Sequence, residues 1–214
     1  MSASSPSLNA TSGEPAVPPS HTASRPAAYT VDTVHQAAQH LRAGDVLAYP
    51  TEAVFGLGAD PDNEAAVARI FALKGRPSSV GVLLIASAFE HIAPLIDLSQ
   101  VSAEALAQAH ASWPGPMTWV FPRSERVPPW VSGGHTGIAL RISAHPPVRA
   151  LCQAFGGPIV STSANLHGQP PAVDIATLHH YFGDRLDAVL DAPLGAQTRA
   201  TPIRDVLTGA WLRQ

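Results

Sequence analysis

Residues 49–77 read YPTEAVFGLGADPDNEAAVARIFALKGRP, and the rest of the chain is organised around this stretch. It begins at the end of a short apolar run that is typical of a buried strand. A segment with two glycines and a proline follows, and its composition predicts a loop. Asp62 or Asn63 then caps a helix in which Val67, Ile70 and Phe71 recur at helical spacing. A strand that leads through a loop into a helix indicates an α/β protein.

Lys74 ends that helix and is the only lysine of the chain, whereas all the other cationic side chains, of 13 in total, are arginines. An ammonium group is a compact, mobile charge, and a guanidinium group is a planar fork. Retaining one ammonium two residues before Arg76 therefore predicts a chemical role for Lys74. The alternative is a solvated lysine that interacts favourably with the helix C-terminus.

Composition predicts one domain with a tail. The chain has 214 residues and is 45% hydrophobic, which is enough for one core. Residues 1–28 are rich in Ser, Pro, Ala and Thr, so we expect a disordered tail before a domain at 29–214. No apolar run is long enough to span a membrane, and no secretory signal is visible. The single cysteine, Cys152, cannot form an internal disulfide, and we expect it to pack as an apolar residue in a soluble, cytoplasmic protein.

Charge and histidine spacing argue against two classes of protein. The formal net charge of −3 does not fit a chain that coats nucleic acid through bulk charge, although a local basic groove stays open. The ten histidines include no HxxxH pair and no neighbouring CxxC, so we predict no metal site.

Helical and strand-like segments alternate along the whole chain. We expect helices at about 30–44, 63–74, 87–95, 102–111, 146–155 and 175–182, and strands within 45–50, 80–87, 117–122, 136–143, 158–165 and 186–191. Residues 202–214 resemble a terminal hairpin. This order predicts an α/β fold, a twisted and mixed sheet flanked by helices.

Small polar residues follow several of these strands, where α/β proteins tend to bind ligands. They are Thr51, Thr118, Ser161, Ser163 and Asn165. With Lys74 and Arg76 they form a predicted site of two cations and several neutral donors. No paired carboxylates, GxSxG motif or dinucleotide or phosphate-loop motif is present, so an anionic ligand and phosphoryl or nucleotidyl transfer fit best. The alternative is that each such residue only caps a turn, and that Arg141 only forms a structural ion pair.

Five segments together resemble the YrdC-like family: YPTEAVFGLGADPDNE, FALKGRP, WPGPMTWVF, IALRISAHP and VSTSANLHGQPP. The resemblance covers the chain from about residue 31 to its end and implies a YrdC/RibB-like fold. It implies an enzyme that joins L-threonine, bicarbonate and ATP into threonylcarbamoyl-adenylate and releases pyrophosphate. The product modifies an adenosine next to the anticodon of tRNA, so proteins that transfer the group to tRNA are implied partners, and direct binding of tRNA is possible.

The resemblance also assigns roles to residues. Lys74 and Arg76 would neutralise the reacting anions, and Mg²⁺ would arrive with ATP and need no metal site of the protein. The implied ATP contacts are Lys74, Arg76, Ser161, Ser163, Asn165 and Arg213. The implied threonine contacts are Thr51, Thr118, Arg141, Ser161 and Thr201. Many relatives have a threonine where this chain has Ala53, so one hydroxyl group of the family pattern is missing.

Two other functions compete with this one. The first is a non-catalytic module that binds tRNA or rRNA in the same groove, with a steep salt dependence and no ATP chemistry. The second is a carbamoyl-adenylate former, as in the YrdC-like module of hydrogenase-maturation proteins, but those long chains carry cysteine motifs that this chain lacks.

Overall fold

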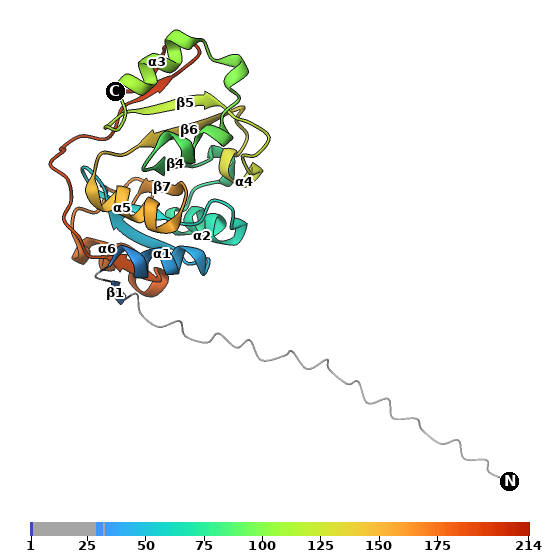
Figure 1. Cartoon of the computed structure of the whole chain (residues 1–214). Helices are drawn as coiled ribbons and strands as arrows, with labels where there is room; N and C mark the ends of the chain where they lie inside the picture. The colour runs from blue at the N-terminus through green and yellow to red at the C-terminus, as the bar shows by residue number, and fades with distance from the viewer. Residues whose placement is uncertain (2–28, 32) are drawn as a thin grey trace.

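The computed structural model describes Met1 and residues 29–31 and 33–214. The predicted disordered tail, apart from Met1, lies outside the described residues. The described chain folds as one α/β domain around a mixed sheet, as the sequence predicts (Figure 1). None of the helices in the described part is long and apolar enough to cross a membrane.

The sheet has the strand order β1-β8-β2-β3-β7-β4-β6-β5-β9-β10. Its strands are β1 (Tyr29–Val31), β2 (Leu47–Pro50), β3 (Phe55–Gly58), β4 (Leu83–Ala86), β5 (Thr118–Pro122), β6 (Gly137–Ile142), β7 (Ile159–Ser163), β8 (Ala188–Leu190), β9 (Ile203–Asp205) and β10 (Trp211–Arg213). Four of the neighbouring pairs are parallel: β1–β8, β2–β8, β4–β6 and β5–β9. The other pairs in this order are antiparallel, so the sheet is mixed.

Two groups of helices cover the sheet and enclose two apolar clusters. The helices are α1 (Val34–Arg42), α2 (Glu64–Lys74), α3 (Ala103–Ala111), α4 (Pro129–Ser132), α5 (Pro146–Phe155) and α6 (Ile175–Phe182). Helices α1 and α5 pack together in one cluster, which contains the fully buried Cys152, as predicted. The buried apolar residues of α2, α3 and α6 belong to the other cluster. The apolar helix faces thus bury the sheet on two sides.

One predicted loop is wrong, because the segment after Thr51 contains strand β3. Gly56 and Gly58 indicated a loop, yet β3 pairs with both β2 and β7. A Cβ atom on Gly58 would lie 2.8 Å from Cε1 of Tyr49, whose ring occupies that space. The glycines therefore serve close packing within the sheet and not a turn.

Other helix predictions differ at their boundaries. Helix α1 starts at Val34, with Thr33 as its N-cap, and not at about residue 30. The helix expected at 87–95 consists of two short 3₁₀ turns, Phe89–His91 and Ala93–Leu95. Helix α2 begins after Asn63 and ends at Gly75, as predicted.

Candidate active site

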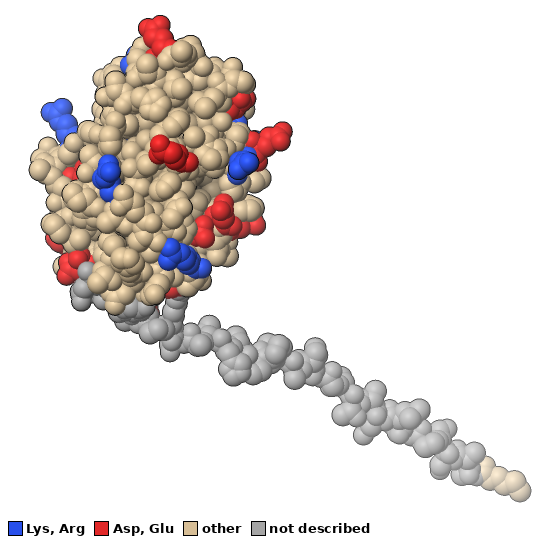
Figure 2. Space-filling view, viewed as in Figure 1, with Lys and Arg blue, Asp and Glu red and all other residues tan. Residues whose placement is uncertain are grey.

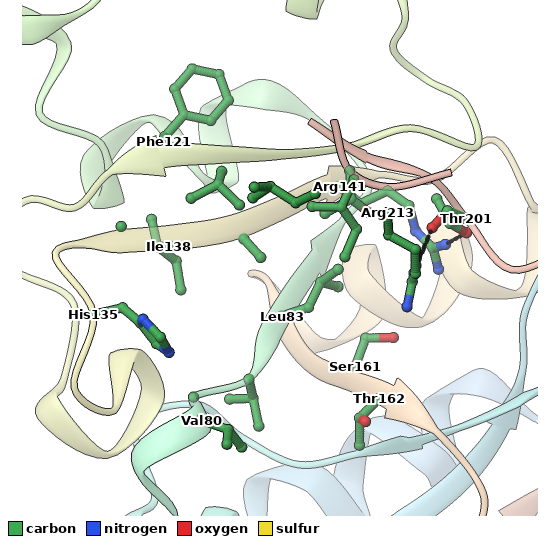
Figure 3. Close-up of a pocket in the computed structure, with 18 of the residues that line it drawn as sticks. Val80, Leu83, Phe121, His135, Ile138, Arg141, Ser161, Thr162, Thr201 and Arg213 are labelled. Atoms are coloured by element: carbon green, nitrogen blue, oxygen red, sulfur yellow. Dashed lines mark hydrogen bonds between the residues drawn. The ribbon is translucent and has the colours of Figure 1, made fainter. Parts of the chain in front are cut away.

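A cavity of about 1250 Å³ opens where β5, β6 and β7 meet the loop after β2 and the C-terminal hairpin (Figure 3). All of the predicted site residues except Lys74 and Asn165 line it. These residues are Thr51, Arg76, Thr118, Arg141, Ser161, Ser163, Thr201 and Arg213. In Figure 3 the polar groups of Arg141, Arg213, Thr201 and Ser161 lie toward one end, and Phe121, Ile138 and Val80 lie toward the other together with the ring of His135. The cavity thus has a polar end and a second end where apolar side chains lie beside one histidine.

Lys74 lies just behind the cavity, against the turn that follows β7. Its ammonium donates hydrogen bonds to the carbonyl oxygens of Ser163 (2.5 Å) and Asn165 (3.2 Å) and to Oδ1 of Asn165 (2.8 Å). Oδ1 of Asn165 also accepts from the hydroxyl of Ser163 at 2.8 Å. The three ammonium donors are therefore occupied by the protein, and Lys74 holds the turn in its shape.

Burial first, and then the charge of Arg76, together lower the pKa of Lys74 to about 8. Lys74 is only 4% exposed. A buried ammonium loses hydration, so its neutral form becomes more accessible. The alternative, a solvated lysine at the helix end, is thereby contradicted.

The threonine hydroxyls of the cavity differ in their partners. Thr51 Oγ1 donates to the carbonyl oxygen of Val54 at 2.6 Å, which closes the turn between β2 and β3. Thr118 is fully buried, and its Oγ1 has no hydrogen-bond partner in the described part of the chain. A buried hydroxyl without a partner costs free energy, so Thr118 is a ready contact for a polar ligand in the cavity.

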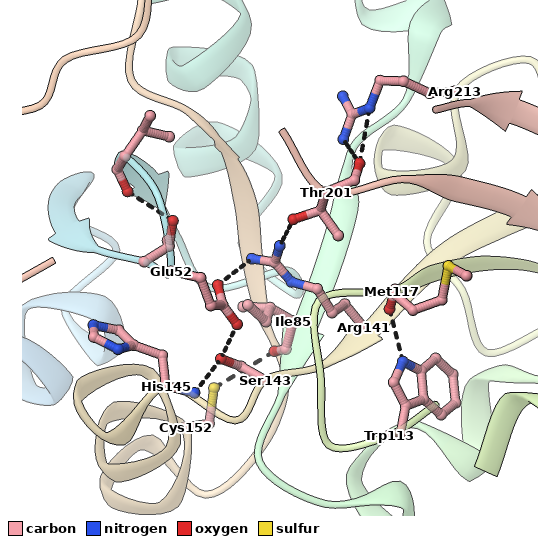
Figure 4. A network of polar contacts seen from close by, with 12 residues as sticks. Glu52, Ile85, Trp113, Met117, Arg141, Ser143, His145, Cys152, Thr201 and Arg213 are labelled. Carbon is pink, nitrogen blue, oxygen red and sulfur yellow. Dashed lines mark hydrogen bonds and ion pairs between the residues drawn. The ribbon is translucent and has the colours of Figure 1, made fainter. Parts of the chain in front are cut away.

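Arg141 is held by a polar network that joins three distant segments (Figure 4). Its guanidinium lies 3.3 Å from Oε2 of Glu52 and donates to Oγ1 of Thr201. Arg213 donates twice to the carbonyl oxygen of Thr201, at 2.9 Å and 2.5 Å. The pKa of Arg213 is lowered, first by burial and second by the charge of Arg141. Two cations therefore lie close together, as an anion site requires.

Glu52 is the partner that the sequence prediction missed. Its carboxylate is buried, and Oε1 accepts a hydrogen bond from Ser143 Oγ at 2.6 Å. The sequence did hold one signal, a charged residue only two positions after a buried strand, because a carboxylate that becomes buried there requires partners. Arg141 therefore forms a structural ion pair and also lines the cavity.

The segment 191–202, which links β8 to β9, is a second feature that the prediction missed, and we call it the strap. Its Gly195 amide donates to the carbonyl oxygen of Thr51 at 2.9 Å, and the Gln197 amide donates to that of Glu52 at 3.0 Å. In Figure 1 it is the orange-red segment that runs between the two halves of the molecule. Its residues 198–201 line the cavity.

Charged side chains on the outer surface show a different pattern. On the face seen in Figure 2, Lys and Arg side chains lie singly among Asp and Glu and form no continuous basic patch. The cavity, in contrast, is lined by five arginines and two carboxylates: Arg76, Arg123, Arg141, Arg199, Arg213, Glu125 and Asp205. Positive charge is therefore gathered in the cavity of a chain whose formal net charge is −3.

Comparison with known proteins identifies the family. The Sua5/YciO/YrdC family model, described as "Telomere recombination", matches residues 39–214. The threonylcarbamoyl-AMP synthase of Halorhodospira halophila is 53% identical over 181 residues, which cover 85% of this chain and 94% of that protein. The synthase of Coxiella burnetii is 46% identical, with 85% and 96% covered.

Solved structures agree with this result. Sua5 of P. abyssi in complex with L-threonine has a TM-score of 0.76 and 31% identity, and the match covers 83% of this chain and 53% of that longer one. E. coli YciO has a TM-score of 0.73 at 21% identity, with 87% and 96% covered, which shows the shared fold. From residue 39 to residue 214, the chain is therefore a member of the Sua5/YciO/YrdC family.

Proposed function

We propose that this protein is a threonylcarbamoyl-AMP synthase, which makes threonylcarbamoyl-AMP and pyrophosphate from L-threonine, bicarbonate and ATP. The observation that carries the proposal is one cavity that gathers a set of hydroxyl groups and several guanidinium groups around the turn held by Lys74. Two relatives at 53% and 46% identity, named as such synthases, support the same activity. We place the enzyme in the cytoplasm and expect tRNA-modifying proteins to consume its product.

The reaction needs two anions brought together more than it needs a base. The amine of threonine reacts with bicarbonate to give a carbamate and water. A carbamate oxygen then attacks the α-phosphorus of ATP, and the bond from that phosphorus to the bridging oxygen breaks. Pyrophosphate leaves with the electron pair. Positioning and charge stabilisation dominate such a step, and Arg76, Arg141 and Arg213 supply cationic charge along the cavity wall.

We propose that the threonine substrate lies at the polar end of the cavity. The unpartnered hydroxyl of Thr118 accepts or donates one hydrogen bond to it, and Ser161 lies on the neighbouring wall. A site built to pair its buried hydroxyl with a ligand discriminates against ligands that leave the hydroxyl unpaired. The related P. abyssi Sua5 was solved in complex with L-threonine, which supports threonine as the substrate.

We propose that Mg²⁺ enters with the triphosphate. This ion prefers oxygen ligands and keeps several waters, so phosphate oxygens can provide most of its coordination. The cavity fits this arrangement, because the hydroxyls of Ser161 and Ser163 and the carboxylates of Glu125 and Asp205 line it and would offer further oxygen ligands. The bound ion would neutralise phosphate charge during transfer.

The test is the substrate dependence of pyrophosphate release. We expect release from ATP to require both L-threonine and bicarbonate, and Lys74→Ala to remove most of it because the turn after β7 loses three hydrogen bonds. Circular dichroism of the variant checks that the fold remains. Release that ignores threonine would refute the substrate assignment. RNA binding with a steep salt dependence and no ATP turnover would favour the RNA-binding alternative.

A further inference from the structure

The strap is fixed at several points along its length. His145 Nε2 and the carbonyl oxygen of Pro193 are hydrogen-bonded at 3.1 Å. The amides of Gly195 and Gln197 bond to the loop after β2. Thr201 is held on both sides, because its hydroxyl accepts from Arg141 and its carbonyl accepts from Arg213. The strap thus has fixed points immediately before and after residues 198–200.

The three residues between these fixed points are free. Thr198, Arg199 and Ala200 are exposed, and all three line the cavity. No hydrogen bond from their backbone amides or from the Arg199 guanidinium occurs within the part of the chain that the structure describes. A span anchored at both ends keeps its place while its donors stay available, which lowers the entropy cost of binding a ligand.

Arg199 differs from most other arginines of the cavity. Arg141 is paired with Glu52 and Thr201, Arg213 donates to Thr201, and Arg123 donates to the carbonyl oxygen of His135. Among the described cavity-lining arginines, only Arg76 and Arg199 have guanidinium groups with no hydrogen-bond or ion-pair partner. A free guanidinium is suited to bidentate recognition of phosphate or carboxylate.

We propose that Arg199, presented by the strap, is a further substrate-binding residue that contacts the polyphosphate of the nucleotide. This inference rests on the proposed function for the identity of the nucleotide. Both a phosphate and the carboxylate of threonine offer the oxyanion that Arg199 can bind. The polyphosphate is favoured because it carries several negative charges, whereas the carboxylate carries one, and two free guanidinium groups match the larger charge.

The experiment compares binding of two probes to the full chain by calorimetry. Pyrophosphate represents the polyphosphate, and L-threonine represents the carboxylate. The variants are Arg199→Ala and Arg199→Lys, and the matched control is Arg126→Ala, whose exposed guanidinium neither lines the cavity nor has a partner among the described residues.

For Arg199→Ala we expect the Kd for pyrophosphate to rise by about 10- to 100-fold, the size of a lost charged hydrogen bond. Arg199→Lys should recover only part of this affinity, because an ammonium keeps the charge without the fork. The Kd for L-threonine should stay within about twofold, and Arg126→Ala should match the wild type for both probes.

Three outcomes would overturn the inference. The first is an unchanged Kd for pyrophosphate in Arg199→Ala, and the second is no binding of pyrophosphate by the wild type. The third is a loss of L-threonine affinity in Arg199→Ala that is as large as its loss of pyrophosphate affinity. The proposed function is tested separately by turnover of the wild type. Failure of threonine-dependent turnover would remove the synthase activity and still leave the pyrophosphate site of Arg199 measurable.

Discussion

Lys74 places a charged group in a buried position, and its three hydrogen bonds hold the backbone that carries Ser163 and Asn165. The sequence predicted that this lysine is special, since no other lysine occurs. It did not predict that the ammonium bonds to the protein itself. That detail depends on the distance between the end of α2 and the turn after β7, which only the tertiary structure sets.

The lowered pKa of Lys74, about 8 against the ordinary 10.5, predicts how stability depends on pH. Between these values the unfolded chain binds the proton more tightly, so the free energy of unfolding rises with pH. The cost of burying the charge is present below pH 8 and is relieved above it. We expect the wild type to gain about 1–2 kcal/mol between pH 7 and 9.5 relative to Lys74→Met, measured by urea unfolding. Equal pH dependence of the two proteins would contradict this prediction.

Thr118 offers a prediction in which stability and function change in opposite directions. Thr118→Val keeps the shape of the side chain and removes a buried hydroxyl that has no partner in the described structure. We expect the free energy of unfolding to rise by about 1 kcal/mol, and the KM for L-threonine to rise at least about tenfold because the ligand loses its partner. Thermal unfolding and pyrophosphate release measure the two effects. A variant that is destabilised and keeps its KM would show that the hydroxyl serves the fold.

At the scale of elements, periodicity and capping residues predicted most helices and strands. Helix α2, for example, follows from its cap at Asn63 and its stop at Gly75. Strand β3 was missed because Gly58 has no side chain and so adds nothing to an alternating pattern. A glycine is needed at this position because the ring of Tyr49, on the neighbouring strand, occupies the space that a Cβ atom would take. The strap was missed because its fixed points are hydrogen bonds to segments far away in the chain, and those of Gly195 and Gln197 involve only backbone groups, which leave no pattern in the sequence.

Gly195 tests whether the docked strap matters for activity. A Cβ atom there would lie 2.6 Å from the carbonyl oxygen and 2.7 Å from Cα of Glu52, so Gly195→Ala must lift the strap from the loop after β2. We expect a loss of about 1–2 kcal/mol in the free energy of unfolding for two broken hydrogen bonds, and a fall in kcat/KM of at least about tenfold.

The matched control for this change is Gly157→Ala, where a Cβ atom meets nothing within 4 Å and φ is not in the left-handed region. We expect this variant to keep the activity of the wild type and to be equally or slightly more stable. Wild-type kinetics in Gly195→Ala would show that the strap need not dock for turnover.

At the scale of the whole molecule, the sequence predicted the fold class and most of the predicted site residues that line the cavity. It did not predict how charge is distributed over the molecule. The formal net charge of −3 does not reveal that five arginines line one cavity. Such an arrangement depends on how β5, β6, the strap and the C-terminal hairpin come together. The strand ends and the resemblance predicted the site residues. Six of those that line the cavity lie in the five resembling segments, whereas Thr201 comes from the strap and Arg213 from β10.

The gathered positive charge predicts a salt effect on one substrate. We expect the KM for ATP to rise several-fold, by roughly 3- to 10-fold, between about 50 and 500 mM KCl, because ions screen the field that attracts the triphosphate. The KM for L-threonine, which carries no net charge, should change by less than about twofold. Steady-state kinetics at fixed Mg²⁺ measure both. Equal salt effects on the two substrates would contradict the role given to the cavity arginines.

The burial of Lys74 has a further consequence for an enzyme whose product is an activated acyl group. Amines are the side-chain groups that such a mixed anhydride acylates most readily, and guanidinium groups resist it. Because the single ε-amino group of the chain is enclosed and bonded to three oxygens, the folded enzyme offers its product few nucleophiles of its own. Peptide mapping by mass spectrometry after prolonged turnover should therefore show no added mass at Lys74.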